Sequence, residues 1–212
     1  MDDASTNGRP GAPTPSDEAL MASFRHGDAR AFEVLVARHK RGLFNFLLRS
    51  VGNRSRAEEL LQDVFVRVIR AKGRYEQTAR FSTWIYTIAR NICVDESRRA
   101  KFRRVASLDA PRRGRDGEEG GSMLDATAAD QVGVDDEAMG PTLQARLAAA
   151  VDRLPEDQRE VFLMRQLSGL SFKEIGDVVG APENTVKSRM RYALEKLREE
   201  LTDLQELAAG ER

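Results

Sequence analysis

The sequence is poor in the residues that stabilise secreted proteins and membrane proteins. Its 212 residues include one cysteine, Cys93, which excludes a disulfide framework and a thiolate metal cluster. No apolar run approaches the roughly 20 residues of a membrane-spanning helix, so membrane insertion is not expected. The amino-terminal stretch begins with acidic residues and has no apolar core, which argues against a signal peptide. A cytoplasmic protein is therefore the expectation.

Net charge and catalytic motifs are also absent. Lys plus Arg and Asp plus Glu both number 34, so the overall charge points to no class of partner. The sequence has no Walker loop, no GxGxxG and no HExxH. Its two histidines, His26 and His39, fall on different expected helices, away from the cysteine and from paired carboxylates. We therefore expect no enzyme, no metal site and no cofactor.

What the sequence does contain is helical periodicity. Residues 16–104 and 142–209 follow the 3.6-residue period, and no segment alternates as a strand would, which predicts an all-α fold. Between them, residues 105–141 are rich in glycine, more acidic than basic, and without a helical period. A loop of this length is uncommon inside one domain. We expect two small helical domains joined by a flexible acidic linker, after a disordered tail over residues 1–15.

Four helices are expected in the first domain. Ser16 and Asp28 can cap the first two, because their side-chain oxygens accept backbone N–H groups at a helix start. Ser55, with Glu58 three residues later, fits a capping box at the start of the third helix. The expected boundaries are Ser16 to Gly27, Asp28 to Gly52 and Ser55 to Gly73, with a fourth helix from Phe81.

The fourth helix begins with FSTWIYTIARN and holds the only tryptophan, Trp84. Phe81, at the start of its apolar stripe, is expected in the core, whereas for Trp84 the core and a partner surface are equally open. The stripe consists of Phe81, Ile85, Ile88 and Ile92. The opposite face, which can reach a partner, carries Thr83, Tyr86, Thr87 and Arg90, with Asn91 at its margin. Taken alone, Asn91 is typical of an exposed helix residue.

The most specific local pattern lies between Ser171 and Leu197. Ser171 and Glu174 form a second capping box, and Gly180 ends the short helix that follows. Pro182 suits the first turn of the next helix. Two helices joined by a glycine-containing turn predict a helix-turn-helix, whose second helix would enter a DNA major groove.

The second helix of this motif is amphipathic and basic. From Glu183 to Arg198 it has five basic and two acidic residues in an otherwise neutral chain. Contacts between such residues and phosphates supply much of the affinity of DNA-binding proteins, so DNA binding is the favoured interpretation. An ordinary solvated basic face is the alternative. The expected apolar side consists of Val186, Met190, Ala193, Leu194, Leu197 and Leu201.

Two blocks of sequence resemble one family. LPEDQREVFLMRQLSGLSFKEIGDVVGAPENTVKSRMRYALEKLREEL closely resembles region 4 of the extracytoplasmic-function (ECF) sigma factors, which are small bacterial transcription initiation factors. GDARAFEVLVARHKRGLFNFLLR, AEELLQDVFVRVIRA and RFSTWIYTIARNICVDESRR resemble their region 2 in order and spacing. The two blocks cover about 150 residues and are separated by a linker, which a single helix-turn-helix repressor would not explain.

The resemblance implies that the two domains bind different parts of core RNA polymerase and of the promoter. Region 2 (16–104) would bind the clamp helices of core RNA polymerase and melt the −10 element of promoter DNA. Region 4 (142–209) would bind the polymerase flap and read the −35 element, and the linker would enter the polymerase channel. Many members are controlled by an anti-sigma factor, so such a protein is a candidate partner.

The exposed faces of the expected helices, interpreted with this resemblance, give the candidate site residues. For −35 recognition they are Asn184, Thr185, Lys187, Ser188, Arg191 and Tyr192. For −10 recognition they are Tyr75, Thr83, Tyr86, Arg90, Asn91, Arg98 and Arg99. For polymerase binding they are Glu59, Gln62, Asp63 and Val66. Asn91 and the loop from Arg74 to Arg80 match the positions that hold a flipped −10 base in the family.

Two other classes of function remain open from the sequence. A stand-alone repressor would bind DNA without polymerase and would not need the first hundred residues. A protein-interaction module would leave the basic second helix unexplained. A gel-shift assay with and without core polymerase separates these alternatives.

Overall fold

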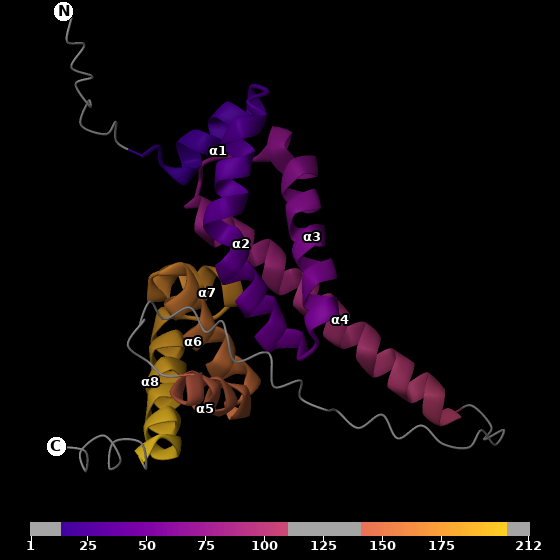
Figure 1. The fold of residues 1–212 in the computed structure, drawn as a ribbon, viewed down its shortest axis with the longest axis vertical. Helices are drawn as coiled ribbons and strands as arrows, with labels where there is room; N and C mark the ends of the chain where they lie inside the picture. Colours follow the sequence, from indigo (N-terminus) through magenta and orange to yellow (C-terminus); the bar gives the residue numbers. More distant parts are fainter. Residues whose placement is uncertain (1–13, 110–140, 203–212) are drawn as a thin grey trace, which may run out of the picture.

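The computed structural model describes residues 14–109 and 141–202, and within these ranges every regular element is a helix, which confirms the predicted class (Figure 1). The expected tail and most of the expected linker lie outside the described residues. The first half contains α1 (Asp17–Arg25), α2 (Ala29–Val51), α3 (Arg54–Ala71), the short 3₁₀ helix η1 (Lys72–Arg74) and α4 (Phe81–Asp109). The second half contains α5 (Pro141–Arg153), α6 (Glu156–Ser168), α7 (Phe172–Val179) and α8 (Glu183–Glu200).

The first two helices begin and end where the sequence predicts. The Ser16 side chain accepts a hydrogen bond from the Ala19 amide at 3.2 Å, and Asp28 accepts one from the Arg30 amide at 3.0 Å. Gly52 ends α2 in the left-handed conformation, with φ of 68°. Each of these caps satisfies backbone groups that a helix end leaves without an internal partner.

The predicted start of the third helix is wrong by two residues. Asn53, rather than Ser55, caps α3, and its side-chain oxygen accepts a hydrogen bond from the Arg56 amide at 2.9 Å. Asn is as good a capping residue as Ser, so the helix begins at the earlier of the two competing positions. Glu58 instead pairs with Arg54 at 3.2 Å, one turn away along the helix.

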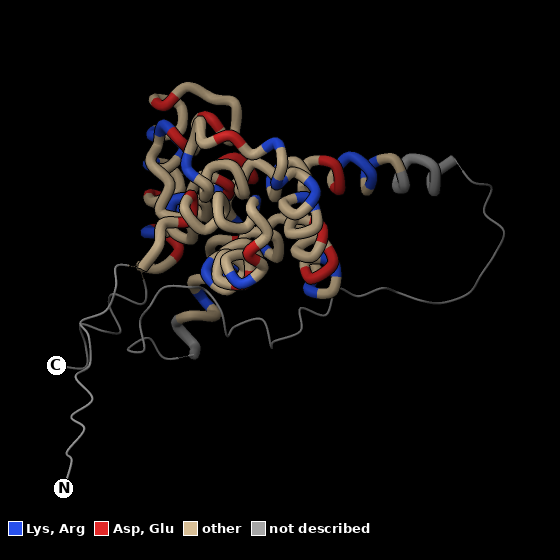
Figure 2. The backbone as a smooth tube through the Cα atoms, turned by 90° about the horizontal axis from the view of Figure 1, so that it is seen from above, with Lys and Arg blue, Asp and Glu red and all other residues tan. Residues whose placement is uncertain are grey.

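The fourth helix is longer than expected. It runs to Asp109, past the predicted linker start at residue 105. The added residues, VASLD, contain no glycine or proline, so no helix-breaking residue interrupts α4 there. The last described turns of α4 project from the body of the molecule and carry basic residues (Figure 2).

The core of the first half is formed by α1 to α4. Phe81 is 1% exposed, as predicted, and its ring lies 5.2 Å from the His39 ring and 6.2 Å from the Tyr75 ring. Other fully buried side chains in this half come from every long helix: Met21, Leu35, Leu43, Phe46, Leu47, Leu60 and Ile85.

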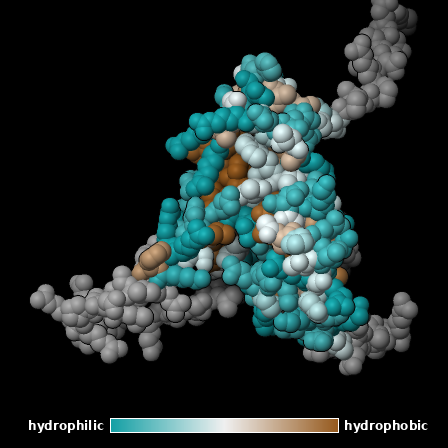
Figure 3. Space-filling model, turned by 180° about the vertical axis from the view of Figure 1, so that it is seen from behind, coloured by the Kyte–Doolittle hydropathy of each residue, from teal (hydrophilic) through white to brown (hydrophobic). Residues whose placement is uncertain are grey.

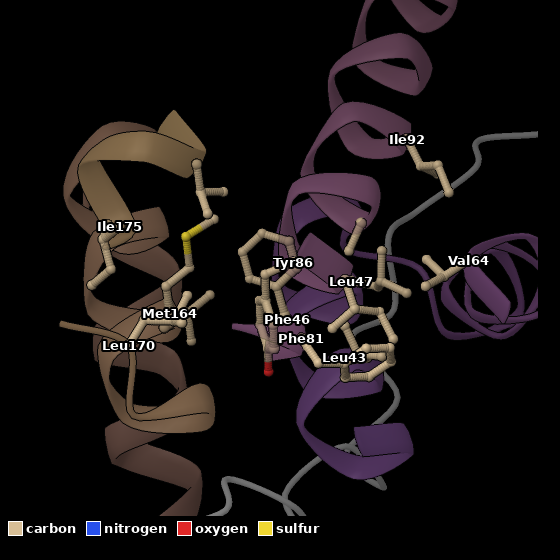
Figure 4. Packing of buried hydrophobic residues seen from close by; sticks show 14 of the residues in the cluster. Leu43, Phe46, Leu47, Val64, Phe81, Tyr86, Ile92, Met164, Leu170 and Ile175 are labelled. Carbon is tan, nitrogen blue, oxygen red and sulfur yellow. The ribbon is translucent and has the colours of Figure 1, made fainter. Parts of the chain in front are cut away.

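The two halves pack against each other through α2 and α4 on one side and α6 and α7 on the other. Tyr86 of α4 lies between the two groups of buried side chains and is 1% exposed (Figure 4). A Cβ atom on Gly42 would lie 2.8 Å from the Tyr86 hydroxyl oxygen and 3.0 Å from the Leu167 carbonyl oxygen. The absence of a side chain at position 42 therefore permits this close approach of α2, α4 and α6.

Candidate nucleic-acid and polymerase interfaces

The helix-turn-helix forms as predicted. The Ser171 side chain accepts the Glu174 amide hydrogen bond at 3.2 Å, and the Glu174 carboxylate accepts the Ser171 amide at 2.8 Å. Gly180 ends α7 with φ of 69°, in the left-handed region that favours glycine. Between α7 and α8 the chain turns so tightly that a Cβ on Gly176 would lie 2.6 Å from the Ala181 carbonyl oxygen. This turn fixes the direction of α8 relative to α7.

The face of α8 that is expected to meet DNA is open to solvent. Lys187 pairs with Glu183 at 2.7 Å, and the Arg191 guanidinium lies 4.7 Å from the centre of the Tyr192 ring. Both contacts are local and exposed, so solvent screens them and both side chains are free to exchange partners. The residues of this exposed face are Asn184, Thr185, Lys187, Ser188, Arg191 and Tyr192.

The buried side of α8 is narrower than predicted. Val186, Met190, Ala193 and Leu197 are buried, but Leu194 is 46% exposed and Leu201 is only partly buried. The four buried residues recur at intervals of four, three and four, and therefore follow one line along the helix. Leu194 lies one position, about 100°, around the helix from Ala193, outside the strip that α6 and α7 cover.

The face of α4 that was predicted to reach a partner is covered by the second half of the chain. Thr83 is 5% exposed, and its hydroxyl donates to a Glu174 carboxylate oxygen at 3.4 Å. Tyr86 is buried in the apolar part of the same contact, and burial raises the pKa of its phenol far above the ordinary value. The expectation that these two residues are accessible is therefore wrong for this arrangement. The two residues are buried because α7, about 90 residues further along the chain, packs on this face of α4.

Ion pairs border this contact. Arg90 of α4 donates to Glu160 of α6 at 2.6 Å, and Arg49 of α2 donates to Asp152 of α5 at 2.5 Å. Burial raises the pKa of the Glu160 carboxyl, and the nearby Arg90 opposes that rise. Arg80 also approaches Glu174, at 3.8 Å. The second half thus occupies both the apolar and the charged part of the α4 face.

The loop before α4 is organised around aromatic rings. Tyr75 is 5% exposed, so the expectation that it offers a free flat surface is also wrong in this arrangement. Its ring lies 4.9 Å from that of Trp84, which is partly buried. The Tyr75 hydroxyl is buried without a hydrogen-bond partner in the described structure. An unpaired buried hydroxyl costs free energy. The packing of the Tyr75 ring against Phe81 and Trp84, and not its hydroxyl, therefore stabilises this loop.

Three of the residues predicted for −10 recognition remain exposed. They are Asn91, which follows the Arg90 that bonds Glu160, and Arg98 and Arg99, which lie about two turns further along α4. Phe102, in the same basic run, is 77% exposed. An exposed aromatic side chain among arginines suits a surface that meets nucleic acid, although single exposed apolar residues are also common.

The predicted polymerase face of α3 is exposed and has an apolar centre. Gln62 and Asp63 are exposed, and Val66 is 39% exposed. Ile69, which the sequence pattern does not single out, is 43% exposed and lies three residues after Val66, on the same side of α3. Glu59 is also exposed but pairs with Arg56 at 2.5 Å.

The back of the molecule is mostly hydrophilic, with an apolar area between hydrophilic side chains in its upper part (Figure 3).

Residues 14–109 and 141–202 offer no cluster of His, Cys, Asp and Glu side chains suited to a metal ion. No helix in these ranges is long and apolar enough to cross a membrane. His39 bonds Asp17 at 2.7 Å, which gives it a structural partner. Burial raises the pKa of the Cys93 thiol to about 11, so this thiol is protonated at neutral pH.

Two family models match the chain, one in each half. The model of sigma-70 region 2 matches residues 35–103, and the model of sigma-70 region 4 matches residues 144–197. The first match includes α3 and most of α4, and the second includes α7 and α8 up to residue 197. Together they span the three surfaces described above.

Curated relatives match almost the whole chain. It is 37% identical over 185 residues to the RNA polymerase sigma factor CarQ of Myxococcus xanthus, covering 87% of this chain and 97% of the relative. It is 30% identical over 180 residues to the ECF RNA polymerase sigma factor SigW of Bacillus subtilis, covering 85% of this chain and 94% of the relative. The solved structure of CnrH in complex with the cytosolic domain of CnrY is 26% identical, with a TM-score of 0.60 over 89% of this chain and 99% of CnrH. The sigma factor RpoE of Bartonella quintana, solved with the anti-sigma factor NepR, has the same TM-score at 23% identity and supports the fold.

Proposed function

Because the chain belongs to the ECF group of sigma-70 factors, it binds core RNA polymerase and directs it to promoters, and we propose how three of its helices divide that work. The observation that supports this division is the position of the two family matches. Each contains a helix whose exposed residues suit a different partner: α3 in the first and α8 in the second.

The α8 helix reads the −35 element. Its exposed basic face stands opposite the buried strip, and the turn at Gly180 directs its amino-terminal end away from α7. Lys187 contacts phosphates, and Ser188 and Arg191 contact base edges, because they lie in the first turns of the helix that enters the groove.

The α3 helix docks on the clamp helices of core polymerase. Val66 and Ile69 supply the apolar centre of the contact, and Gln62 and Asp63 supply a polar edge. Interfaces commonly have this organisation, with an apolar centre and a polar rim. The partner helices are basic in the family, and Asp63 complements that charge.

The α4 helix and the loop before it capture a −10 base after the two halves have separated. Asn91 is exposed already, whereas Thr83, Tyr86 and Arg90 become available to DNA only when α6 and α7 leave the α4 face. A flipped base needs hydrogen bonds on its edge and a flat surface for stacking, and this face carries both kinds of group. Binding to polymerase through α3, together with flap binding by the second half, supplies the energy for separation.

The chain works in the cytoplasm, where core polymerase and promoter DNA are found, and it has no catalytic activity of its own. An anti-sigma factor is a further partner. CnrH, at 26% identity, was solved with the cytosolic domain of CnrY, which supports a partner of this kind.

In vitro transcription tests the function as a whole. A library of genomic fragments is transcribed with core polymerase, with and without this chain. New transcripts that share −35 and −10 elements are expected only when the chain is present. A gel-shift assay separates the repressor alternative, because tight specific binding in the absence of polymerase and no new transcripts in its presence would contradict the proposal.

A further inference from the structure

The loop Tyr75–Arg80 precedes α4 and is held at both ends by one helix, α1. At its start, the Arg25 guanidinium donates to the Tyr75 carbonyl oxygen at 2.9 Å. At its end, the Phe81 amide donates to the Glu18 carboxylate at 2.9 Å. Glu18 and Arg25 are seven residues apart, which is about 10 Å along a helix, so α1 fixes the distance between the two ends of the loop.

Glu18 completes the start of α4. The residue before α4 is Arg80, whose side chain cannot accept a hydrogen bond from a backbone amide. The Glu18 carboxylate supplies this acceptor from another helix, at the end of α4 where the helix dipole favours a negative charge. The hydrogen bond from Phe81 is the main reason why the pKa of Glu18 is lower than the ordinary value for a glutamate.

The α1 helix is itself firmly attached. Leu20, Met21 and Phe24 are each at most 8% exposed and pack into the core of the first half. Asp17 bonds both Arg38 and His39 of α2 at 2.7 Å. Because His39 also contacts the Phe81 ring, α1, α2 and the start of α4 form one connected cluster.

We propose that α1 is a brace that holds the loop Tyr75–Arg80 in the conformation needed for −10 base capture, with Glu18 and Arg25 as positioning residues. The inference rests on the proposed function of the loop. It adds a role for residues 17–25, which lie before the start of the sigma-70 region 2 match at residue 35. Neither Glu18 nor Arg25 needs to touch DNA, because each acts through the backbone of the loop.

Trp84 gives a direct readout of the brace in the free chain. It is the only tryptophan, and its ring packs on Tyr75 and Phe81, the two loop ends that α1 holds. Glu18→Ala and Arg25→Ala should each shift its fluorescence emission to longer wavelength. Amide hydrogen exchange in residues 75–83 should rise by roughly five- to tenfold, as expected for loss of a helix cap. Ser23→Ala, an exposed residue of the same helix, is the matched control and should change neither signal.

The second readout is promoter opening by the full chain with core polymerase. Permanganate reactivity of −10 thymines should fall several-fold in Glu18→Ala and Arg25→Ala, and discrimination against a substituted −10 base should weaken. Core affinity and duplex binding should stay near wild type, because α1 remains anchored by its apolar side and by Asp17, and the melting temperature should fall by only about 2–4 °C, as the loss of one helix cap implies. Glu18→Gln retains a carbonyl acceptor and should recover part of both signals.

Two results would overturn the brace. Wild-type fluorescence and exchange in both Glu18→Ala and Arg25→Ala would show that α1 does not hold the loop. Altered fluorescence with unchanged opening and unchanged base discrimination would show that the loop conformation does not matter for capture. Failure of the wild-type chain to open any promoter would instead contradict the proposed function, and the free-chain measurements would still decide whether α1 holds the loop.

Discussion

Glu174 shows how one side chain connects a local motif to the packing of the whole chain. Its carboxylate accepts the Ser171 amide as part of the capping box, accepts the Thr83 hydroxyl of α4, and lies 3.8 Å from Arg80. Burial tends to raise the pKa of this carboxyl. The hydrogen bonds from Ser171 and the charge of Arg80 outweigh burial, so the pKa is lower than usual and the carboxylate is charged at neutral pH. The cap of the helix-turn-helix is thus also a contact of the α4 face.

Gly42 is the residue at which the closed packing is most sensitive to size. Gly42→Ala should destabilise the packed halves by about 1–3 kcal/mol, because the added methyl group has no space between Tyr86 and Leu167. Small-angle scattering should show a larger radius of gyration. Adding Tyr86→Phe removes the nearest atom and should restore part of the compactness. An unchanged radius in Gly42→Ala would show that α2 can move aside without parting the halves.

Arg191 is the residue whose loss should alter promoter choice. Arg191→Ala should cost about 1–3 kcal/mol in promoter binding and relax the preference at one −35 position, if the guanidinium reads a base edge. The same substitution should leave the melting temperature near wild type, since the side chain is 64% exposed. Selection from a library of randomised −35 elements measures the change. Identical preferences in the variant and the wild type would remove Arg191 from the reading face.

At the scale of the helix, α4 combines a core side and a functional side that respond differently to substitution. Phe81→Ala should cost about 3–5 kcal/mol of folding stability, because the ring is fully buried among other aromatic rings. It should therefore impair every activity together. Asn91→Ala should leave stability and duplex binding nearly unchanged and reduce open-complex formation. Thermal denaturation and permanganate reactivity measure the two effects, and equal instability of both variants would contradict the assignment of faces.

The α3 surface should separate polymerase binding from folding. Asp63→Arg and Ile69→Ser should each weaken core binding several-fold without lowering the melting temperature, because both residues are exposed. Glu33→Arg, an exposed charge on α2, is the matched control. Core affinity is measured by fluorescence anisotropy of labelled chain. Wild-type affinity in both variants would place the docking surface elsewhere.

The sequence predicted local features of these helices well and distant contacts poorly. The caps at Ser16, Asp28 and Ser171 depend only on neighbouring residues, so a sequence pattern is sufficient to locate them. The start of α3 was misplaced because Asn53 and Ser55 are both competent caps. The burial of Tyr86 could not be predicted from periodicity, because its neighbours in α6 and α7 are not specified by the pattern of α4.

For the whole molecule, the central feature is that two sequence blocks with separate roles share one packed interface. Glu160→Ala removes the partner of Arg90 without altering a predicted DNA-contact residue. A hydrogen bond to a charged group contributes about 1.5–3 kcal/mol, but burial of the Glu160 carboxylate opposes this gain, so the closed packing should weaken by less than that amount. We expect a larger radius of gyration and faster open-complex formation, since separation of the halves precedes base capture.

The control for that experiment is Glu156→Ala, which removes an exposed carboxylate from the same helix. Stopped-flow kinetics with a fluorescent promoter measures the rate of opening. A slower rate in Glu160→Ala, or an equal increase in both variants, would contradict the view that the Arg90–Glu160 pair keeps the halves together.

The covered face of α4 also bears on how the free chain meets single-stranded DNA. Single-stranded DNA is exposed at replication forks, at repair intermediates and in transcription bubbles, and a free base-capturing surface would adsorb to it without regard to promoters. In the closed chain, the second half contacts Thr83, Tyr86 and Arg90, so these residues are not accessible to single-stranded DNA. If this face captures bases as proposed, the closed chain is kept from single-stranded DNA until its halves separate and remains available to polymerase.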